Sequence, residues 1–268
     1  MLLRRSPPLA VRTINKKQAD ACLRITTLPM PSQQLIFILV WLFLVRGLGA
    51  QVAGPIVVNS NFTAQALVED VFISGRCQTI SNIQGIGPAA GRAFFSGGAG
   101  ILGFDRGILL ATGNPNAAVG PNRRNDTGSN LVGQTGDVDL SSIAANDIFD
   151  RVGLEFDFVP LDSNVTFRYI FASEEYCEFI NTEYNDVFGF FVSGPGLNGP
   201  YTDGAINAAL LPGSNQTVSI NTVNHSTNSN FYRPNELAAD QILCNLPQNP
   251  TPLREFFEYV WAHHSINR

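Results

Sequence analysis

Lysine is almost absent from this sequence of 268 residues, because Lys16 and Lys17 are the only two. After Ala50 the chain carries 10 Arg against 21 Asp and Glu residues, a formal net charge of about −11. A surface of this sign repels the phosphates of nucleic acids. We therefore expect no nucleic-acid partner, whereas divalent cations, glycans and other proteins remain as candidate ligands.

Cysteine and histidine are also scarce, with four Cys and three His residues. The spacing of the cysteines does not resemble a zinc site or a dense disulfide framework. Cys22 precedes the export signal described below, which leaves Cys77, Cys177 and Cys244. Both a single disulfide with one spare thiol and three buried thiols remain open. The three histidines do not form a metal-ligand set.

The longest apolar run is too short for a membrane span, which needs about 20 residues. It covers the 11 residues Leu35–Val45 and is followed by small residues up to Ala50. This pattern is typical of a secretory signal. We expect residues 30–50 to be a signal peptide cleaved near Ala50 and Gln51, with an uncleaved N-terminal membrane anchor as the alternative.

Residues 1–29 show no clear periodicity and would make an unusually long leader. We expect them to be disordered or absent from the natural product. Both Met1 and Met30 remain candidate start residues, because only the longer form supplies the positive charges that precede a typical signal core.

The exported part, expected to span residues 51–245, has short alternating apolar runs separated by Gly, Pro, Asn and Asp. This pattern predicts strands and turns. The clearest predicted strands are Ile108–Ala111, Leu154–Phe158, Val165–Phe171 and Val187–Val192, the last as one continuous central strand. Helical spacing is confined to Thr63–Val71 and Asp137–Phe149. The predicted fold class is all-β, a β-sandwich or jelly-roll with one or two short helices.

The segment Gly98–Gly103 has the spacing G-x-G-x-x-G of a dinucleotide-binding loop. The residues that follow it predict a turn and a strand, whereas that loop must open a helix. The motif therefore does not indicate a nucleotide site.

A dense series of motifs lies between Leu154 and Asn224: LEFDFVP, FRYIFASEEY, YNDVFGFFVSGPG, GAIN and VSINTVN. Three earlier motifs accompany them, NFTAQALV from Asn61, GILLATG from Gly107 and GDVDL from Gly136. Together they resemble the choice-of-anchor L domain of bacterial exported proteins, over about residues 57–224.

The resemblance implies an extracellular or cell-surface module within larger, often adhesin-like proteins, with no assigned reaction. Domains of this family would continue past Tyr259 into further strands, whereas this chain ends at Arg268. We therefore expect residues 246–268 to be an irregular tail, produced by a frameshift or a fragment end. The final strands of the sandwich and any C-terminal anchor are expected to be missing, so contact with a membrane is expected only through such an anchor or through the N-terminal apolar segment.

An acidic segment after the SEEY motif is the first candidate site. Calcium prefers oxygen ligands, and the predicted ligands are Glu174, Glu175, Glu178 and Asp186. Asp137 and Asp139 form a second candidate pair. The alternative for both sets is a structural role, because short acidic side chains commonly cap backbone N–H groups.

Two functions follow from these residues. The first is a non-catalytic surface module for adhesion, display or ligand binding, stabilised by calcium. The second is a secreted carbohydrate-active hydrolase that uses carboxylates of residues 174–186 as acid and nucleophile. The phenylalanines are expected in the core. Tyrosines near turns are the candidates for exposed contacts, namely Tyr176, Tyr184, Tyr201 and Tyr232.

Overall fold

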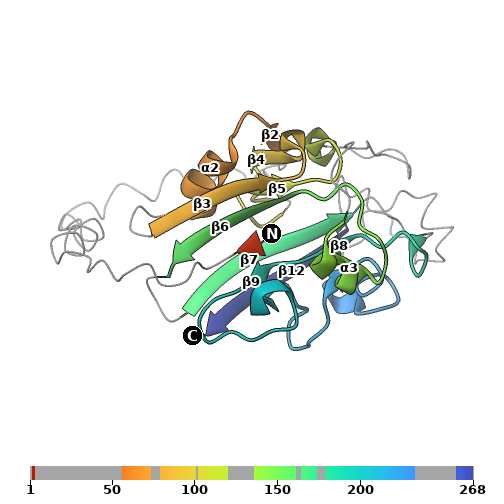
Figure 1. The fold of residues 1–268 in the computed structure, drawn as a ribbon. Helices are drawn as coiled ribbons and strands as arrows, with labels where there is room; N and C mark the ends of the chain where they lie inside the picture. The colour runs from red at the N-terminus through yellow and green to blue at the C-terminus, as the bar shows by residue number, and fades with distance from the viewer. Residues whose placement is uncertain are drawn as a thin grey trace, which may run out of the picture.

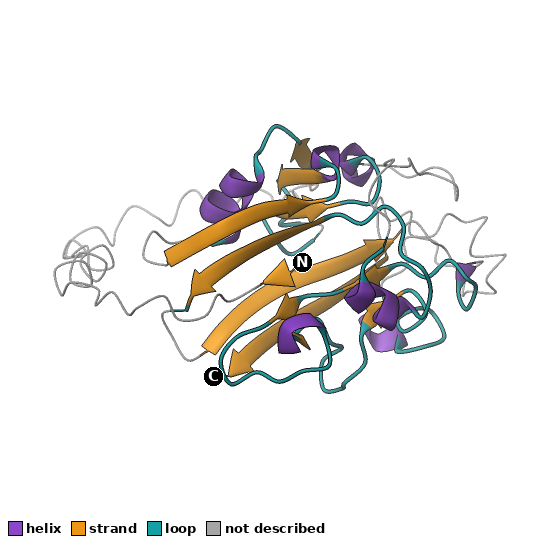
Figure 2. Cartoon of the chain, viewed as in Figure 1, coloured by secondary structure: helices purple, strands orange, loops and turns teal. Residues whose placement is uncertain are grey.

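The fold is a mainly β structure with short helices, in agreement with the predicted fold class (Figure 2). A computed structural model describes residues 2–3, 56–73, 79–100, 102–119, 136–160, 164–173, 179–232 and 258–267. The predicted signal segment and Cys77, Cys177 and Cys244 lie outside these residues. Among the described residues, no helix has the length and apolar character that a membrane crossing requires.

The largest sheet has five strands in the order β10-β9-β1-β6-β3 (Figure 1). Their bounds are Ile206–Asn207, Phe191–Val192, Leu2–Leu3, Gly153–Val159 and Thr79–Ile86. Strand β3 is antiparallel to β6, and β1 is parallel to both β6 and β9. Among the strands of this sheet that pair with a neighbour on both sides, β6 is the longest.

Three smaller sheets complete the β structure. One contains β2, β4 and β5, which span Val57–Asn59, Arg92–Ser96 and Arg106–Leu110. The others pair β7 with β12, at Asn164–Ser173 and Glu258–Asn267, and β8 with β11, at Val187–Phe188 and Val218–Ser219. All of these pairs are antiparallel.

The core lies where β6, β7 and β9 meet the first helical segment. Phe156 on β6 is 1% exposed and packs edge-on against Phe72, with 5.9 Å between ring centroids. Phe167 on β7 stacks on Phe190 at 3.7 Å between centroids. The alternation of apolar residues along β6 and β7 therefore places their large aromatic side chains on the core face.

The first helical segment confirms the helix predicted at Thr63–Val71. It consists of α2, Ala64–Ala66, and η1, a π-helical stretch at Leu67–Phe72. Thr63 is the N-cap, because its Oγ1 accepts a hydrogen bond from the Ala66 N–H at 3.1 Å. Leu67 and its neighbour Val68 are fully buried, so this short helix covers the core.

The second predicted helix is shorter than expected. Helix α3 spans Val138–Ala144, and Ala145 ends it in the left-handed region, with φ of 59°. The helix ends early because of a contact with a distant segment: the side-chain amide of Asn185 donates a hydrogen bond to the carbonyl of Ala144, the last residue of the helix, at 3.1 Å. Ile148 is still buried, and the Gly136 N–H donates to its backbone carbonyl, which closes the segment into a loop.

The prediction of one continuous strand at Val187–Val192 is wrong. This stretch divides into β8 and β9, which belong to different sheets. Between them, the Phe190 N–H donates to the side-chain oxygen of the buried Asn207, Oδ1, at 3.0 Å, and not to a backbone carbonyl of a neighbouring strand. The close packing of Gly189 against the Phe191 ring and Leu140 leaves no room for a side chain at the crossing.

We expected residues 246–268 to be irregular, and this expectation is wrong for ten of them. Glu258–Asn267 form β12, which pairs with β7 from Ser173 to Asn164. Tyr, Val, Trp and Ile in this stretch are strand-forming residues. The long edge of β7 supplies the hydrogen-bonding partner that the sequence pattern does not reveal. Residues 246–257 lie outside the described part of the chain.

Candidate functional site

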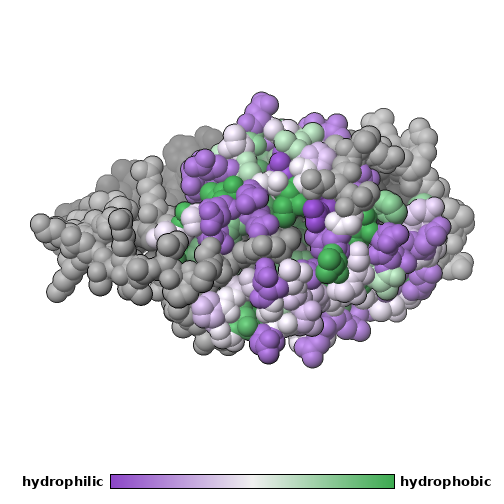
Figure 3. Space-filling model, in the orientation of Figure 1, coloured by the Kyte–Doolittle hydropathy of each residue, from purple (hydrophilic) through white to green (hydrophobic). Residues whose placement is uncertain are grey.

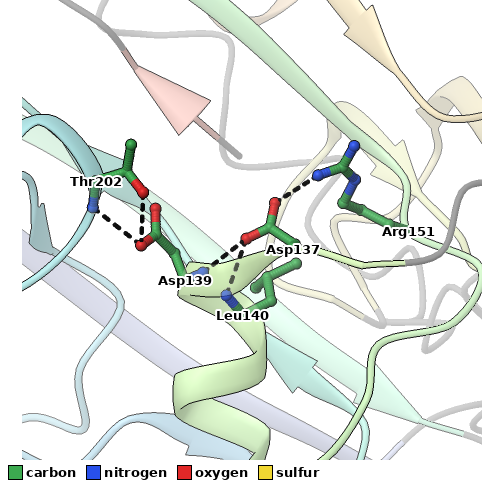
Figure 4. A network of polar contacts seen from close by, with 5 residues as sticks. All are labelled: Asp137, Asp139, Leu140, Arg151 and Thr202. Atoms are coloured by element: carbon green, nitrogen blue, oxygen red, sulfur yellow. Dashed lines mark hydrogen bonds and ion pairs between the residues drawn. The ribbon is translucent and has the colours of Figure 1, made fainter.

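Asp137 acts as the N-cap of α3 (Figure 4). Its Oδ1 accepts hydrogen bonds from the Asp139 N–H at 3.1 Å and the Leu140 N–H at 3.0 Å. Its Oδ2 forms an ion pair with the Arg151 guanidinium at 2.7 Å, and its side chain is 7% exposed. Both carboxylate oxygens therefore satisfy donors of the fold, as expected at a helix N-terminus.

Asp139 joins the same helix start to a distant turn. It is 5% exposed, and its Oδ1 accepts from both the backbone N–H and the hydroxyl of Thr202, at 2.9 and 3.0 Å. Thr202 begins η5, a turn of 3-10 helix at Thr202–Gly204. Figure 4 shows Asp137 and Asp139 pointing away from each other, toward Arg151 and Thr202 respectively. The pair holds three segments together.

Asp186 precedes β8 and lies beside the end of β7. Its Oδ2 accepts a hydrogen bond from the Ser173 hydroxyl at 2.9 Å. Burial of the carboxyl group raises the pKa of Asp186, and the Ser173 hydrogen bond lowers it by a smaller amount. The protonated form of the side chain is therefore favoured in the folded state relative to the unfolded chain.

The structure brings only some of the predicted ligands together. Asp137 and Asp139 are neighbours at the start of α3, and Asp186 lies on a separate segment. Glu174, Glu175 and Glu178 lie outside the described residues. Within the described residues, no group of three or more His, Cys, Asp or Glu side chains is arranged to hold a metal ion.

Buried asparagines are the polar residues that the sequence analysis missed. Asn224 is 1% exposed, and its Oδ1 accepts from the N–H groups of Ser226 and Thr227 while its amide donates to Ile220 O. Asn207 is 5% exposed and joins Phe190 to Ala209 through its Oδ1. The abundance of Asn beside turns was the available signal, but it did not distinguish these residues from surface asparagines.

The tyrosines predicted to be exposed differ from one another. Tyr184 is 56% exposed and rests edge-on against Phe179, with 5.6 Å between ring centroids. Tyr201 is partly buried against Phe191, and burial raises its pKa. The prediction is wrong for Tyr232, which is 6% exposed because it joins the core cluster. Tyr176 lies outside the described residues.

Replacing Asp137 by Ala should lower the free energy of unfolding by about 1–2 kcal/mol, because it removes the N-cap of α3 and the ion pair to Arg151. Urea unfolding measures the effect. Asp147→Ala is the matched control, since Asp147 is exposed in the loop after α3. Equal stability of the two variants would contradict the capping role.

Asp186 should make the stability of the fold fall as pH rises above 3.8, the ordinary pKa of its carboxyl group. Between that value and the raised pKa, the folded state binds more protons than the unfolded state, so the free energy of unfolding decreases with pH. Asp186→Asn should remove this dependence and leave the protein more stable at neutral pH. Urea unfolding across this pH range, with a chelator present and Asp147→Asn as control, measures the slope. If the free energy of unfolding changed equally with pH in the wild type and in Asp186→Asn, this pH dependence could not be assigned to Asp186.

A family model described as the choice-of-anchor L domain matches residues 56–252, which is more than half of the 268-residue chain. The match includes the motifs from Asn61 to Asn224 and extends beyond them on the C-terminal side. No curated protein and no solved structure shows a significant match to the chain. From the extent of the family match, the chain belongs to the choice-of-anchor L domain family.

Proposed function

We propose that this chain is a non-catalytic module that contributes to adhesion or display outside the cell, by binding a glycan or a protein. Choice-of-anchor L domains are non-catalytic, cell-surface modules of exported bacterial proteins.

One observation carries the proposal. Apart from the exposed Glu183, the described carboxylates that the sequence offers for chemistry are bound to donors of the fold itself, with Asp137 on Arg151, Asp139 on Thr202 and Asp186 on Ser173. Catalytic carboxylates must instead be presented to a substrate. These contacts support a structural use of the acidic residues.

The surface also supports a binding role. The coloured part of the face in Figure 3 is mainly hydrophilic, with small hydrophobic areas between polar residues. Tyr184 and Phe149 are exposed by 56% and 68%. The segment of Tyr184 is held by hydrogen bonds from Asn185 to Ala144 O and from Asn146 to Glu183 O. Exposed aromatic rings beside polar groups are typical of contact surfaces.

Protease treatment of intact cells that express the full chain tests the proposal. Because the domain is proposed to stand outside the cell, external protease should cleave it while a cytoplasmic protein stays whole. Protection of the chain until the cells are lysed would contradict export. Hydrolysis of a polysaccharide by the purified chain, lost in Glu174→Gln or Glu175→Gln, would instead favour the carbohydrate-active alternative.

A calcium ion bound by Asp186 with Glu174, Glu175 and Glu178 is the second part of the proposal. The hydrogen bond from Ser173 to Asp186 supports it, because Glu174 is the residue that directly follows Ser173 in the sequence. A cation would also offset the cost of desolvating this carboxylate. An ion at Asp137 and Asp139 would have to displace Arg151 and Thr202 from their oxygens, so the proposal is confined to the segment of Asp186.

Calcium should raise the melting temperature of the purified chain, and a chelator should reverse the rise. A calcium concentration of 100 times the Kd stabilises the native state by about 2.7 kcal/mol. Asp186→Asn should reduce the calcium-dependent rise, while Asp147→Asn should leave it unchanged. Equal melting temperatures with calcium and with chelator would remove the calcium proposal and leave the adhesive one standing.

A further inference from the structure

Exposed apolar side chains gather around α3. Among the described residues five large hydrophobic side chains are exposed, and three of them, Val138, Phe149 and Tyr184, lie on α3, in the loop after it and on the segment bound to it. Figure 3 shows a hydrophobic area over α3, next to hydrophilic residues. We call this surface the α3 corner, defined by Val138 and by residues 145–150 and 181–184.

The fold holds the Tyr184 segment in place. The Asn146 side-chain amide donates to the backbone carbonyl of Glu183 at 3.3 Å, and the Tyr184 N–H donates to Thr182 Oγ1 at 3.2 Å. The Tyr184 ring rests edge-on against Phe179. A partner that binds this ring therefore loses less entropy than one that must first order a free loop.

The two exposed rings are within reach of one short segment of a partner. Asn146, which contacts the residue before Tyr184, precedes Phe149 by three residues, at most about 11 Å of chain. An extended segment of six residues spans about 20 Å. Such a segment is long enough to contact both Tyr184 and Phe149.

The charge of the corner is negative. Asp147 and Glu183 are exposed, and Asp150 is partly exposed. Residues 144–151 and 179–186 contain one basic residue, Arg151, which forms an ion pair with Asp137. Because complementary potentials steer partners together and like charges keep them apart, this surface favours a positively charged partner over an anionic one.

Arginine matches both features of the corner. Its planar guanidinium stacks on aromatic rings and also pairs with carboxylates, whereas a neutral glycan gains nothing from the net charge. We propose that the α3 corner binds an arginine-bearing segment of a partner protein, with guanidinium groups against Tyr184 and Phe149 and beside Asp147 and Glu183. The proposal deepens the proposed function by naming the class of ligand, and it rests on that function for the placement of the domain outside the cell.

Fluorescence anisotropy on the purified full chain tests the corner with two labelled hexapeptides, one of alternating glycine and arginine and one of alternating glycine and lysine. Wild type should bind the arginine peptide more tightly. Tyr184→Ala should weaken that binding about fivefold and remove the preference for arginine, because it deletes a cation–π partner. Asp147→Asn should weaken the binding of both peptides. The matched controls are Asp70→Asn on η1 and Val159→Ala at the far end of β6, both exposed, and they should bind as wild type.

Equal binding of the arginine peptide to wild type, Tyr184→Ala and Asp147→Asn would overturn the proposal, as would equal weakening in the two controls, which would assign the binding to net charge alone. Binding of labelled cellohexaose that Tyr184→Ala abolishes, with no binding of either peptide, would assign the corner to a glycan and overturn the protein version. If Tyr184→Ala does not fold, Phe149→Ala replaces it in the same assay. Because the protein is purified, protection of the chain in intact cells would contradict export without changing these outcomes.

Discussion

The fold depends on the burial of β6 and of the helical segment that packs on it. Leu154 and Phe156 on β6 and Leu67 and Val68 on the helix are all at most 1% exposed, and they join one core cluster with residues of β7 and β9. Fully burying a side chain of this size contributes about 1.5–3 kcal/mol. The two-sided pairing of β6 follows from this burial, because its backbone groups cannot reach water.

The same constraint explains the use of polar side chains in the loops. Short strands and long connections leave many backbone N–H and C=O groups without strand partners, and such groups are costly when buried. Asp137, Asp139, Asn207 and Asn224 bind these groups or join separate loops. Acidic and amide residues are therefore part of the framework of this domain, which agrees with a family of non-catalytic surface modules.

The arrangement also suggests how such a domain interacts with other molecules. Hydrogen bonds hold the segment of the exposed Tyr184 against residues 144–146, and the Gly136 N–H donates to the carbonyl of Ile148, next to the exposed Phe149.

The sequence alone determined the fold class, the family and the positions of β5, β6, β7 and the first helix, because alternation, helical spacing and motifs are local properties. Only the tertiary structure decided where α3 ends, where Val187–Val192 divides and which side chain pairs with Asp137 at the start of α3. Each of these outcomes depends on a residue distant in sequence: Asn185 for α3, Asn207 for the division, and Arg151 for Asp137. A pattern read along one segment contains no information about such partners, because the fold brings them together only when the core forms.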